Sequence, residues 1–304
     1  MISYSWLKIR RRSMADYVIA AASTADLPRE FFEEHDVPLI SYSFMLGDKI
    51  CEDDCREKSR EEMYRQMRQG AILTTSMINV LTYYEFFKKL MDTGKDVIFL
   101  DMSRELSHSY VTAGEAAERI RKEYPNRRFY QMDTRCVSGG LGLLVINLVR
   151  LRDEGKSFDE VIAWGEANKL KIIHRFTVDD LNYLKRGGRV SNASALVGSL
   201  LSIKPVLYVS DEGKLVVASK VRGRKAALLT ILNRMKEDLV SPDGQEIHIL
   251  HADCLADAEL MRDKILETFP TVGKVVITSL GVVIGAHCGP GLFTIFYFGD
   301  KRCP

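Results

Sequence analysis

The sequence predicts an α/β protein of two domains: an N-terminal three-layer α/β/α domain with a mainly parallel sheet, and a C-terminal α/β domain with a mixed sheet. The chain has 304 residues, more than one typical hydrophobic core requires. From Tyr17 to Gly155, short apolar runs alternate with amphipathic helical patterns, as in parallel βαβ units. Two later apolar runs are joined only by Asp211-Glu212-Gly213, so these strands must pair antiparallel and make the second sheet mixed.

The N-terminal half begins with a predicted strand at residues 17–22. Asp26 is the expected N-cap of the following helix, and Pro28 lies in its first turn. Ser59-Arg60-Glu61-Glu62 matches a capping box and predicts that another helix begins there. Further strands are expected at residues 37–46, 97–101 and 129–132, and further helices at residues 111–124 and 141–151. The last of these is apolar enough to be a buried helix.

The turn Glu154-Gly155-Lys156 is the best candidate for a domain boundary. We therefore expect domains at residues 15–155 and 156–304, after an N-terminal extension of residues 1–14. That extension carries its basic residues behind its apolar ones, the reverse of a signal peptide. A linking helix is expected at residues 158–170. Strands should follow at 172–178, 206–209, 215–219, 247–250, 275–278 and 292–298, and helices at 193–202, 225–239 and 256–267.

The bulk composition is that of a soluble globular protein, with 46% hydrophobic and 28% charged residues. A formal net charge of +2 argues against a nucleic-acid partner. No run of 18 apolar residues predicts a membrane-spanning helix. The six cysteines, without secretory features, predict free thiols and a cytoplasmic location. Cys51 and Cys55 lack a second pair at zinc-site spacing, so no metal site is expected.

Two glycine-rich segments point to a site that grips a small anion. One reads Gly285-Ala286-His287-Cys288-Gly289-Pro290-Gly291, and the other reads Lys185-Arg186-Gly187-Gly188-Arg189. Glycine lets the backbone approach a ligand closely, while arginine and histidine supply charge and hydrogen-bond donors. Two surface turns that carry polar residues remain the alternative for either segment.

Hydroxyl-rich segments follow several predicted strands of the N-terminal half, where ligands bind in open parallel sheets. They include Ser23-Thr24, Thr74-Thr75-Ser76 and the segment from Ser103 to Ser109. Such groups form a neutral anion cradle at helix starts, although serine and threonine are also common N-caps. The sequence contains no P-loop, no His-Glu-x-x-His and no Gly-x-Ser-x-Gly motif, so neither catalytic residues nor a cofactor is expected.

These segments identify a family resemblance that covers nearly the whole chain from Tyr17 to Phe298. The strongest matches are residues 176–191, residues 203–207, Lys220-Val221-Arg222 and residues 285–291. The chain resembles the DegV family of bacterial fatty-acid-binding proteins. The resemblance implies a two-domain α/β protein that encloses one long-chain fatty acid, such as palmitate, stearate or oleate, in a tunnel between its domains.

The resemblance also implies which residues hold the fatty-acid carboxylate. The expected binding residues are Thr75, Ser76, Ser107, Arg189, Arg222 and His287. The expected supporting residues in the surrounding loops are Ser23, Thr24, Gly188, Gly285, Gly289 and Gly291. Candidate tunnel-lining residues come from the apolar helices at 141–151 and 196–203, although ordinary core packing remains the favoured alternative for most of their positions.

The sequence departs from the family pattern at three places. Ala22 replaces the usual aspartate, Ile78 stands where the family usually has proline, and His108-Ser109 replaces Gly-Thr. The last change leaves Ser103 and Ser109 as alternatives to Ser107 for the carboxylate contact.

The resemblance implies a lipid-binding carrier rather than an enzyme. Some members of the family act as the non-catalytic, lipid-binding subunit of a fatty acid kinase, so such a kinase is an expected partner. Transient membrane contact is also expected. Burying about fourteen methylenes would contribute about 11 kcal/mol before entropy losses. The alternative is a transferase or hydrolase for a small carboxylate or phosphate, in which Ser107 and His287 act as nucleophile and base. A third hypothesis is a sensor or adaptor whose lipid occupancy controls a partner.

Overall fold

The structure, a computed structural model, describes residues 15–190 and 202–302. Its first sheet has the strand order β2-β1-β6-β7, and every pair in it is parallel. The strands are β1 (Tyr17–Ala22), β2 (Leu39–Ile40), β6 (Asp96–Asp101) and β7 (Phe129–Asp133). This confirms the predicted parallel sheet of the N-terminal half.

The second sheet has six strands in the order β10-β9-β8-β13-β11-β12. Only β11 and β12 pair parallel, so the predicted mixed sheet is confirmed. The antiparallel hairpin of β9 and β10 turns at the segment that predicted it. The strands are β8 (Ile172–Thr177), β9 (Ile203–Val209), β10 (Leu215–Arg222), β11 (Glu246–His251), β12 (Lys274–Ser279) and β13 (Phe293–Phe298).

A third, small antiparallel sheet has the order β4-β3-β5. Its strands are β3 (Ser43–Leu46), β4 (Lys49–Glu52) and β5 (Leu73–Ser76). The prediction of one strand over residues 37–46 is wrong, because the chain leaves the first sheet after Ile40. The backbone N–H of Tyr42 donates to the Ser23 hydroxyl at 3.1 Å, outside any strand ladder, and the chain then turns into β3.

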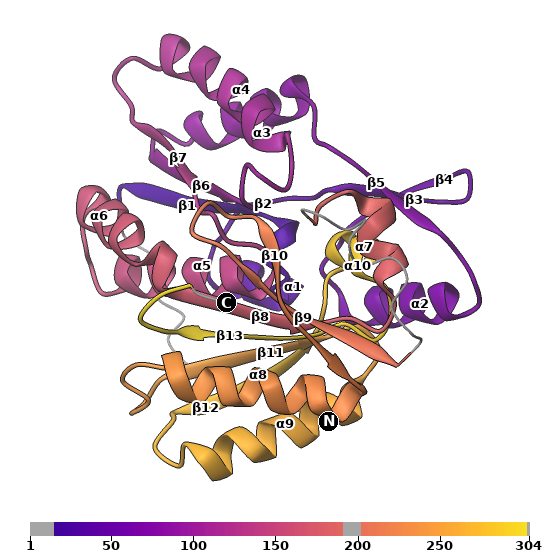
Figure 1. The fold of residues 1–304 in the computed structure, drawn as a ribbon. Helices are drawn as coiled ribbons and strands as arrows, with labels where there is room; N and C mark the ends of the chain where they lie inside the picture. Colours follow the sequence, from indigo (N-terminus) through magenta and orange to yellow (C-terminus); the bar gives the residue numbers. More distant parts are fainter. Residues whose placement is uncertain (1–14, 191–201, 303–304) are drawn as a thin grey trace.

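Figure 1 shows five layers of helices and sheets. The outer helices of the four-stranded sheet are α3 (Val80–Met91) and α4 (Ser109–Glu123), and those of the six-stranded sheet are α8 (Arg224–Asp238) and α9 (Leu255–Thr268). Between the sheets lie α5 (Gly139–Asp153) and α6 (Phe158–Asn168). Helix α5 contacts strands of both sheets and is buried on nearly every side, as its apolar sequence predicts.

The other helices connect these layers. They are η1 (Ser23–Ala25), α1 (Arg29–Glu34), α2 (Glu57–Arg68), η2 (Lys169–Lys171), α7 (Leu181–Gly187) and α10 (Val282–Cys288). No helix among the described residues is long and apolar enough to cross a membrane. The helix expected at residues 193–202 lies almost entirely outside the described residues. The proposed domain boundary falls in the turn between α5 and α6, where Gly155 has a φ of 86°.

Two predicted helix starts are wrong. Asp26 does not cap α1, since Pro28 is its N-cap and the Asp26 side chain instead accepts a hydrogen bond from Ser138 at 2.5 Å in the interior. Helix α2 begins at Glu57, two residues before the predicted capping serine. Ser59 donates to Asp54 at 2.7 Å rather than capping the helix.

Candidate functional site

A cavity of about 260 Å³ lies where the loops after β6 and before α5 meet the inner face of the six-stranded sheet. Both halves of the sequence contribute to its wall. The lining residues are Tyr42, Thr75, Ser76, Met77, Met102, Leu106, Ser107, His108, Val137, Ser138, His174, Phe176, Arg189, Val209, Leu215, Leu280, Val283, Ile284, His287, Cys288, Leu292, Thr294 and Phe296.

The floor of the cavity is built by alternate residues of neighbouring strands. His174 of β8 pairs with Phe296 of β13, and Phe176 pairs with Thr294. Because side chains alternate between the faces of a strand, all four point to the same side. All four are buried, so the floor is enclosed by protein, and together with the buried Val209, Leu215 and Leu292 it is mainly apolar.

The exposed part of the cavity lining is mostly polar. Ser76, Met77, His108 and Arg189 line the cavity and are exposed, whereas the lining residues of the six-stranded sheet are buried. We call these four residues the mouth. The geometry therefore provides a polar opening that leads to an apolar interior, which is the distribution that an amphiphilic ligand with one charged end requires.

Thr75 and His287 meet beside the mouth. The Thr75 hydroxyl and His287 Nε2 lie 2.8 Å apart, which joins β5 to α10. Burial, together with the positive charge of Arg189, lowers the pKa of His287 to about 4. The imidazole is therefore neutral at pH 7, and Arg189 supplies the positive charge of the site.

Arg189 is held by backbone carbonyl groups. Its Nε donates to the carbonyl oxygen of Leu106 at 3.4 Å, and Nη1 donates to that of Gly187. Gly187 also packs tightly against His287, because a Cβ there would lie 2.7 Å from His287 Nδ1. The Gly-Gly turn thus places the guanidinium next to the imidazole, although the two segments are about a hundred residues apart in the sequence.

The three candidate serines of the loop after β6 have different environments. Ser107 lines the cavity. Ser103 is buried and accepts from the N–H of Glu105 at 3.3 Å, while Ser109 is buried and accepts from the N–H of Ile78 at 3.2 Å. A proline at position 78 would have no N–H to donate, so the isoleucine at this position is what allows the bond to Ser109.

Ser23 and Thr24 do not line the cavity, but they bond to residues that hold its wall in place. Thr24 donates to the buried carboxylate of Asp101 at 3.2 Å. Tyr42 and Tyr83 donate to the same carboxylate at 2.9 and 2.7 Å. Since Tyr42 lines the cavity, this network fixes one wall of the site.

The glycines of the second segment allow close packing around α10. The sequence suggested a glycine-rich loop, whereas His287 lies on this short helix. A Cβ on Gly285 would lie 2.2 Å from the Tyr64 hydroxyl oxygen, and one on Gly291 would lie 2.1 Å from Asp179. Gly289 has a φ of 78° and ends α10, and Gly188 has a φ of 65° and ends α7.

Arg222 is not brought to the cavity. It is exposed at the end of β10, opposite Ile203, and does not line the wall. The helix expected to line a tunnel at residues 141–151 likewise packs between the sheets instead. The apolar lining includes residues that the sequence did not assign to the site, namely Phe176 of β8, Phe296 of β13, and Val283 and Ile284 of α10. The apolar run of β13, Phe293–Phe298, was the available signal.

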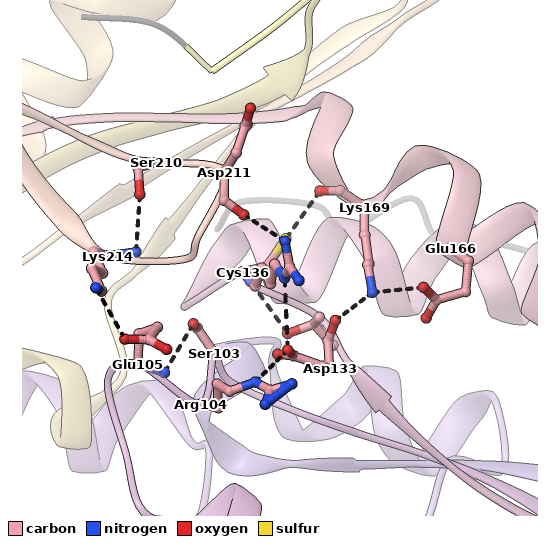
Figure 2. Close-up of polar contacts among 12 residues, drawn as sticks. Ser103, Arg104, Glu105, Asp133, Cys136, Glu166, Lys169, Ser210, Asp211 and Lys214 are labelled. Atoms are coloured by element: carbon pink, nitrogen blue, oxygen red, sulfur yellow. Dashed lines mark hydrogen bonds and ion pairs between the residues drawn. The ribbon is translucent and has the colours of Figure 1, made fainter.

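The hairpin of β9 and β10 closes the cavity on the side of the loop after β6. Figure 2 shows Lys214 paired with Glu105, and these groups lie 3.5 Å apart. The carbonyl of Asp211 accepts a hydrogen bond from Arg135 at 3.2 Å. Gly213 packs directly on Ser103, since a Cβ there would lie 2.1 Å from the serine hydroxyl oxygen. Val209 and Leu215, just before and after the turn, line the cavity.

The nucleophile and base pair of the enzyme hypothesis is not the pair that the structure forms. Ser107 and His287 line the same cavity, but the hydroxyl bonded to His287 belongs to Thr75. Among the residues that the structure describes, no carboxylate hydrogen-bonds or ion-pairs with His287 to orient it as a base.

Comparisons with known proteins agree with this architecture. A family model described as "Uncharacterised protein, DegV family" matches residues 17–300. A DegV domain-containing protein of Clostridium perfringens is 37% identical over 292 residues, which cover 96% of this chain and 100% of that protein. A DegV family protein from Thermus thermophilus, whose structure is described as showing fatty acid binding, has a TM-score of 0.84 and 28% identity, with 93% and 99% of the two chains covered.

The structure of DegV from Bacillus subtilis, described as a fatty acid binding protein, is also similar. Its TM-score is 0.80 and its identity 25%, with 93% of this chain and 99% of that chain covered. The similarity thus extends over both the four-stranded and the six-stranded sheet. The chain belongs to the DegV family.

Proposed function

We propose that this protein binds one long-chain fatty acid, with the acyl chain in the cavity and the carboxylate at the mouth. The observation that carries the proposal is the joined pair of Thr75 and His287 beside an exposed polar mouth, above a buried apolar floor. The similar proteins from Thermus thermophilus and Bacillus subtilis, both described as binding fatty acids, support the same ligand class.

The proposed direct carboxylate contacts are Thr75, Ser76, Ser107 and Arg189, and His287 acts through Thr75. A buried carboxylate requires hydrogen-bond donors and a compensating charge. Arg189 supplies the charge, because His287 is neutral. We assign the imidazole proton to Nε2, so that it is donated to Thr75. The Thr75 hydroxyl then keeps its own proton for a carboxylate oxygen.

We further propose that the bound acid is presented to the ATP-binding subunit of a fatty acid kinase. A carboxylate at the mouth is within reach of a second protein, since Ser76, His108 and Arg189 are exposed. In the reaction, a carboxylate oxygen attacks the γ-phosphorus of ATP and ADP leaves, which yields an acyl phosphate. Arg186 stacks over the Tyr183 ring at 4.4 Å and is exposed beside Arg189, where it would face such a partner.

Contact with a lipid bilayer would allow the acid to be exchanged. Met77, Leu81 and Val111 have exposed fractions of 56%, 59% and 42%. The bonds of Ile78 to Ser109 and Thr112 hold the chain at Met77 against the start of α4. We propose that this apolar rim touches the bilayer. Leu81→Asp should reduce vesicle binding, while Leu266→Asp on α9, 41% exposed in the parent, should not.

The ligand class is tested by organic extraction of the purified, natively folded protein followed by mass spectrometry. We expect a stoichiometric long-chain fatty acid. A protein that carries no lipid, and that takes up neither palmitate nor oleate when these are added, would overturn the proposal. The kinase step is tested by adding ATP and a fatty acid kinase subunit, and trapping the acyl phosphate with hydroxylamine.

A further inference from the structure

We propose that the ring pair of His174 and Phe296 forms the inner end of the acyl site and sets the longest chain that the protein accepts. This inference rests on the proposed function, because it concerns the acyl chain of the same ligand. It assigns a specificity role to two residues that lie at the far end of the cavity from the carboxylate contacts.

The position of the pair follows from the strand geometry. Leu292, Thr294 and Phe296 line the cavity in succession, and Leu292 lies next to α10, which carries His287. At about 3.3 Å per residue, Phe296 lies about 13 Å further along the strand than Leu292. An acyl chain that runs from His287 along the floor therefore meets Phe296 at its terminal methyl end.

The pair belongs to a row of side chains that crosses the floor. His174 is the β8 partner of Phe296, and Leu215 of β10 is the partner of Val209 of β9. Strands β8 and β9 are antiparallel, and Arg175 pairs with Tyr208. The next position along the two strands therefore places His174 beside Val209. All four side chains line the cavity, so the row lies across the path of an acyl chain that follows the floor.

The two rings have no room to withdraw. They pack edge to face, with centroids 5.3 Å apart and planes at 85°. The His174 ring is fixed at both nitrogens, since Nε2 accepts from the N–H of Val137 at 3.3 Å and Nδ1 lies 3.0 Å from the carbonyl oxygen of Ile172. A chain longer than the available path cannot displace the imidazole without breaking one of these bonds.

Two glycines at the start of α5 press on the same rings. A Cβ on Gly139 would lie 2.7 Å from the Phe296 ring, and one on Gly140 would lie 2.0 Å from His174 Nε2. Any side chain at these positions would force the helix off the sheet or the rings into the cavity. The helix start therefore holds the two rings in place.

The experiment compares the affinities of the full-length protein for saturated fatty acids of increasing length, from myristate to behenate, in the parent, Phe296→Ala and Phe293→Ala. Phe293 is an equal control, because it is fully buried on the same strand but on the other face, in a separate core cluster. In Phe296→Ala we expect the length optimum to move to longer acids, with about fourfold higher affinity for each further methylene that the cavity buries.

Phe293→Ala should keep the parental length optimum. An unchanged optimum in Phe296→Ala, or an equal change in both variants, would overturn the inference while leaving fatty-acid binding intact. A parent that binds no acid of any length would overturn the proposed function itself. If either alanine variant fails to fold, Phe296→Leu and Phe293→Leu give the same comparison, and Phe296→Trp should move the optimum to shorter acids.

Discussion

The Thr75 hydroxyl and His287 Nε2 lie 2.8 Å apart although 212 residues separate them in the sequence. The contact joins an edge strand of the smallest sheet to a helix of the C-terminal half. The contact holds the Thr75 hydroxyl in place beside the mouth, which reduces the ordering cost of binding.

Removal of the Thr75 hydroxyl should weaken fatty-acid binding. Thr75→Val deletes a donor to a charged group, and such bonds are worth about 1.5–3 kcal/mol, so we expect about a tenfold to hundredfold loss of affinity. Displacement of a fluorescent fatty acid measures it. Thr74→Val is the matched control, because Thr74 is exposed on the opposite face of the same strand. Equal losses in the two variants would show that Thr75 has no special role.

The stability of the fold should decrease as the pH rises through neutrality, because of Asp26. Burial raises the pKa of Asp26 to about 7. A folded-state pKa above the unfolded value means that the native state binds the extra proton, so this stabilisation is present at low pH and is lost as the pH rises to about 7. Asp26→Asn mimics the protonated form and should remove much of this dependence.

Thermal unfolding between pH 5 and pH 8 measures the effect of Asp26. Asparagine tolerates the left-handed backbone at this position, where φ is 54°. Asp36→Asn is the control, since Asp36 is also left-handed, at φ 49°, but is exposed. We expect Asp36→Asn to follow the parental profile. A parental profile in Asp26→Asn as well would assign the pH dependence to other groups.

Arg60 should be among the most important single residues for stability. It is 1% exposed, and its guanidinium donates to the carbonyls of Asp26, Leu27 and Ser279 at 3.3, 3.1 and 2.7 Å. Arg60→Met leaves these acceptors, and the nearby buried carboxyl groups, without their positive partner. We expect a loss of about 3–5 kcal/mol in the free energy of unfolding, measured in urea. The exposed Arg56→Met should change it by less than about 0.5 kcal/mol.

The contact of the hairpin with the loop after β6 should affect both stability and binding. Gly213→Ala places a Cβ 2.1 Å from the Ser103 hydroxyl oxygen, at a φ of 87°. We expect a lower melting temperature and weaker fatty-acid binding, because the displaced loop carries Leu106 and Ser107. Gly47→Ala has a similarly positive φ of 58° but open space around it, so it isolates the backbone cost of about 1–2 kcal/mol. Unchanged binding in Gly213→Ala would separate the hairpin from the ligand site.

Local sequence patterns predicted the regular elements well where burial determines them. The strand at β6 and the helix at α5 were predicted from apolar runs alone, and the hairpin from the brevity of its turn. The cavity floor could not be predicted, because the pairing of His174 with Phe296 depends on how distant strands are ordered in the sheet. Helix α10 was missed for another reason: its glycines indicate a loop unless the neighbouring Tyr64 is known to require the space.

Some site residues could be predicted from the sequence and others could not, because a local motif does not show where the fold carries it. Thr75, Ser107, Arg189 and His287 come from short motifs, and the fold brings all four to one cavity. Arg222 also belongs to a motif, but the direction of β10 carries it to the surface. The start of α2 shows the limit of capping patterns. Its N-cap is Arg56 and not Ser59, whose hydroxyl donates a hydrogen bond to Asp54 instead.

The sandwiched position of α5 has a consequence for how the molecule unfolds. One core cluster extends from β1 through α5 to β13, so the same helix completes the interior of both sheets. Loss of either sheet would expose one side of α5 to water, which makes the partly unfolded state costly. The two halves of the chain should therefore melt in one cooperative transition, and proteolysis in the turn at Gly155 should not release an independently stable fragment.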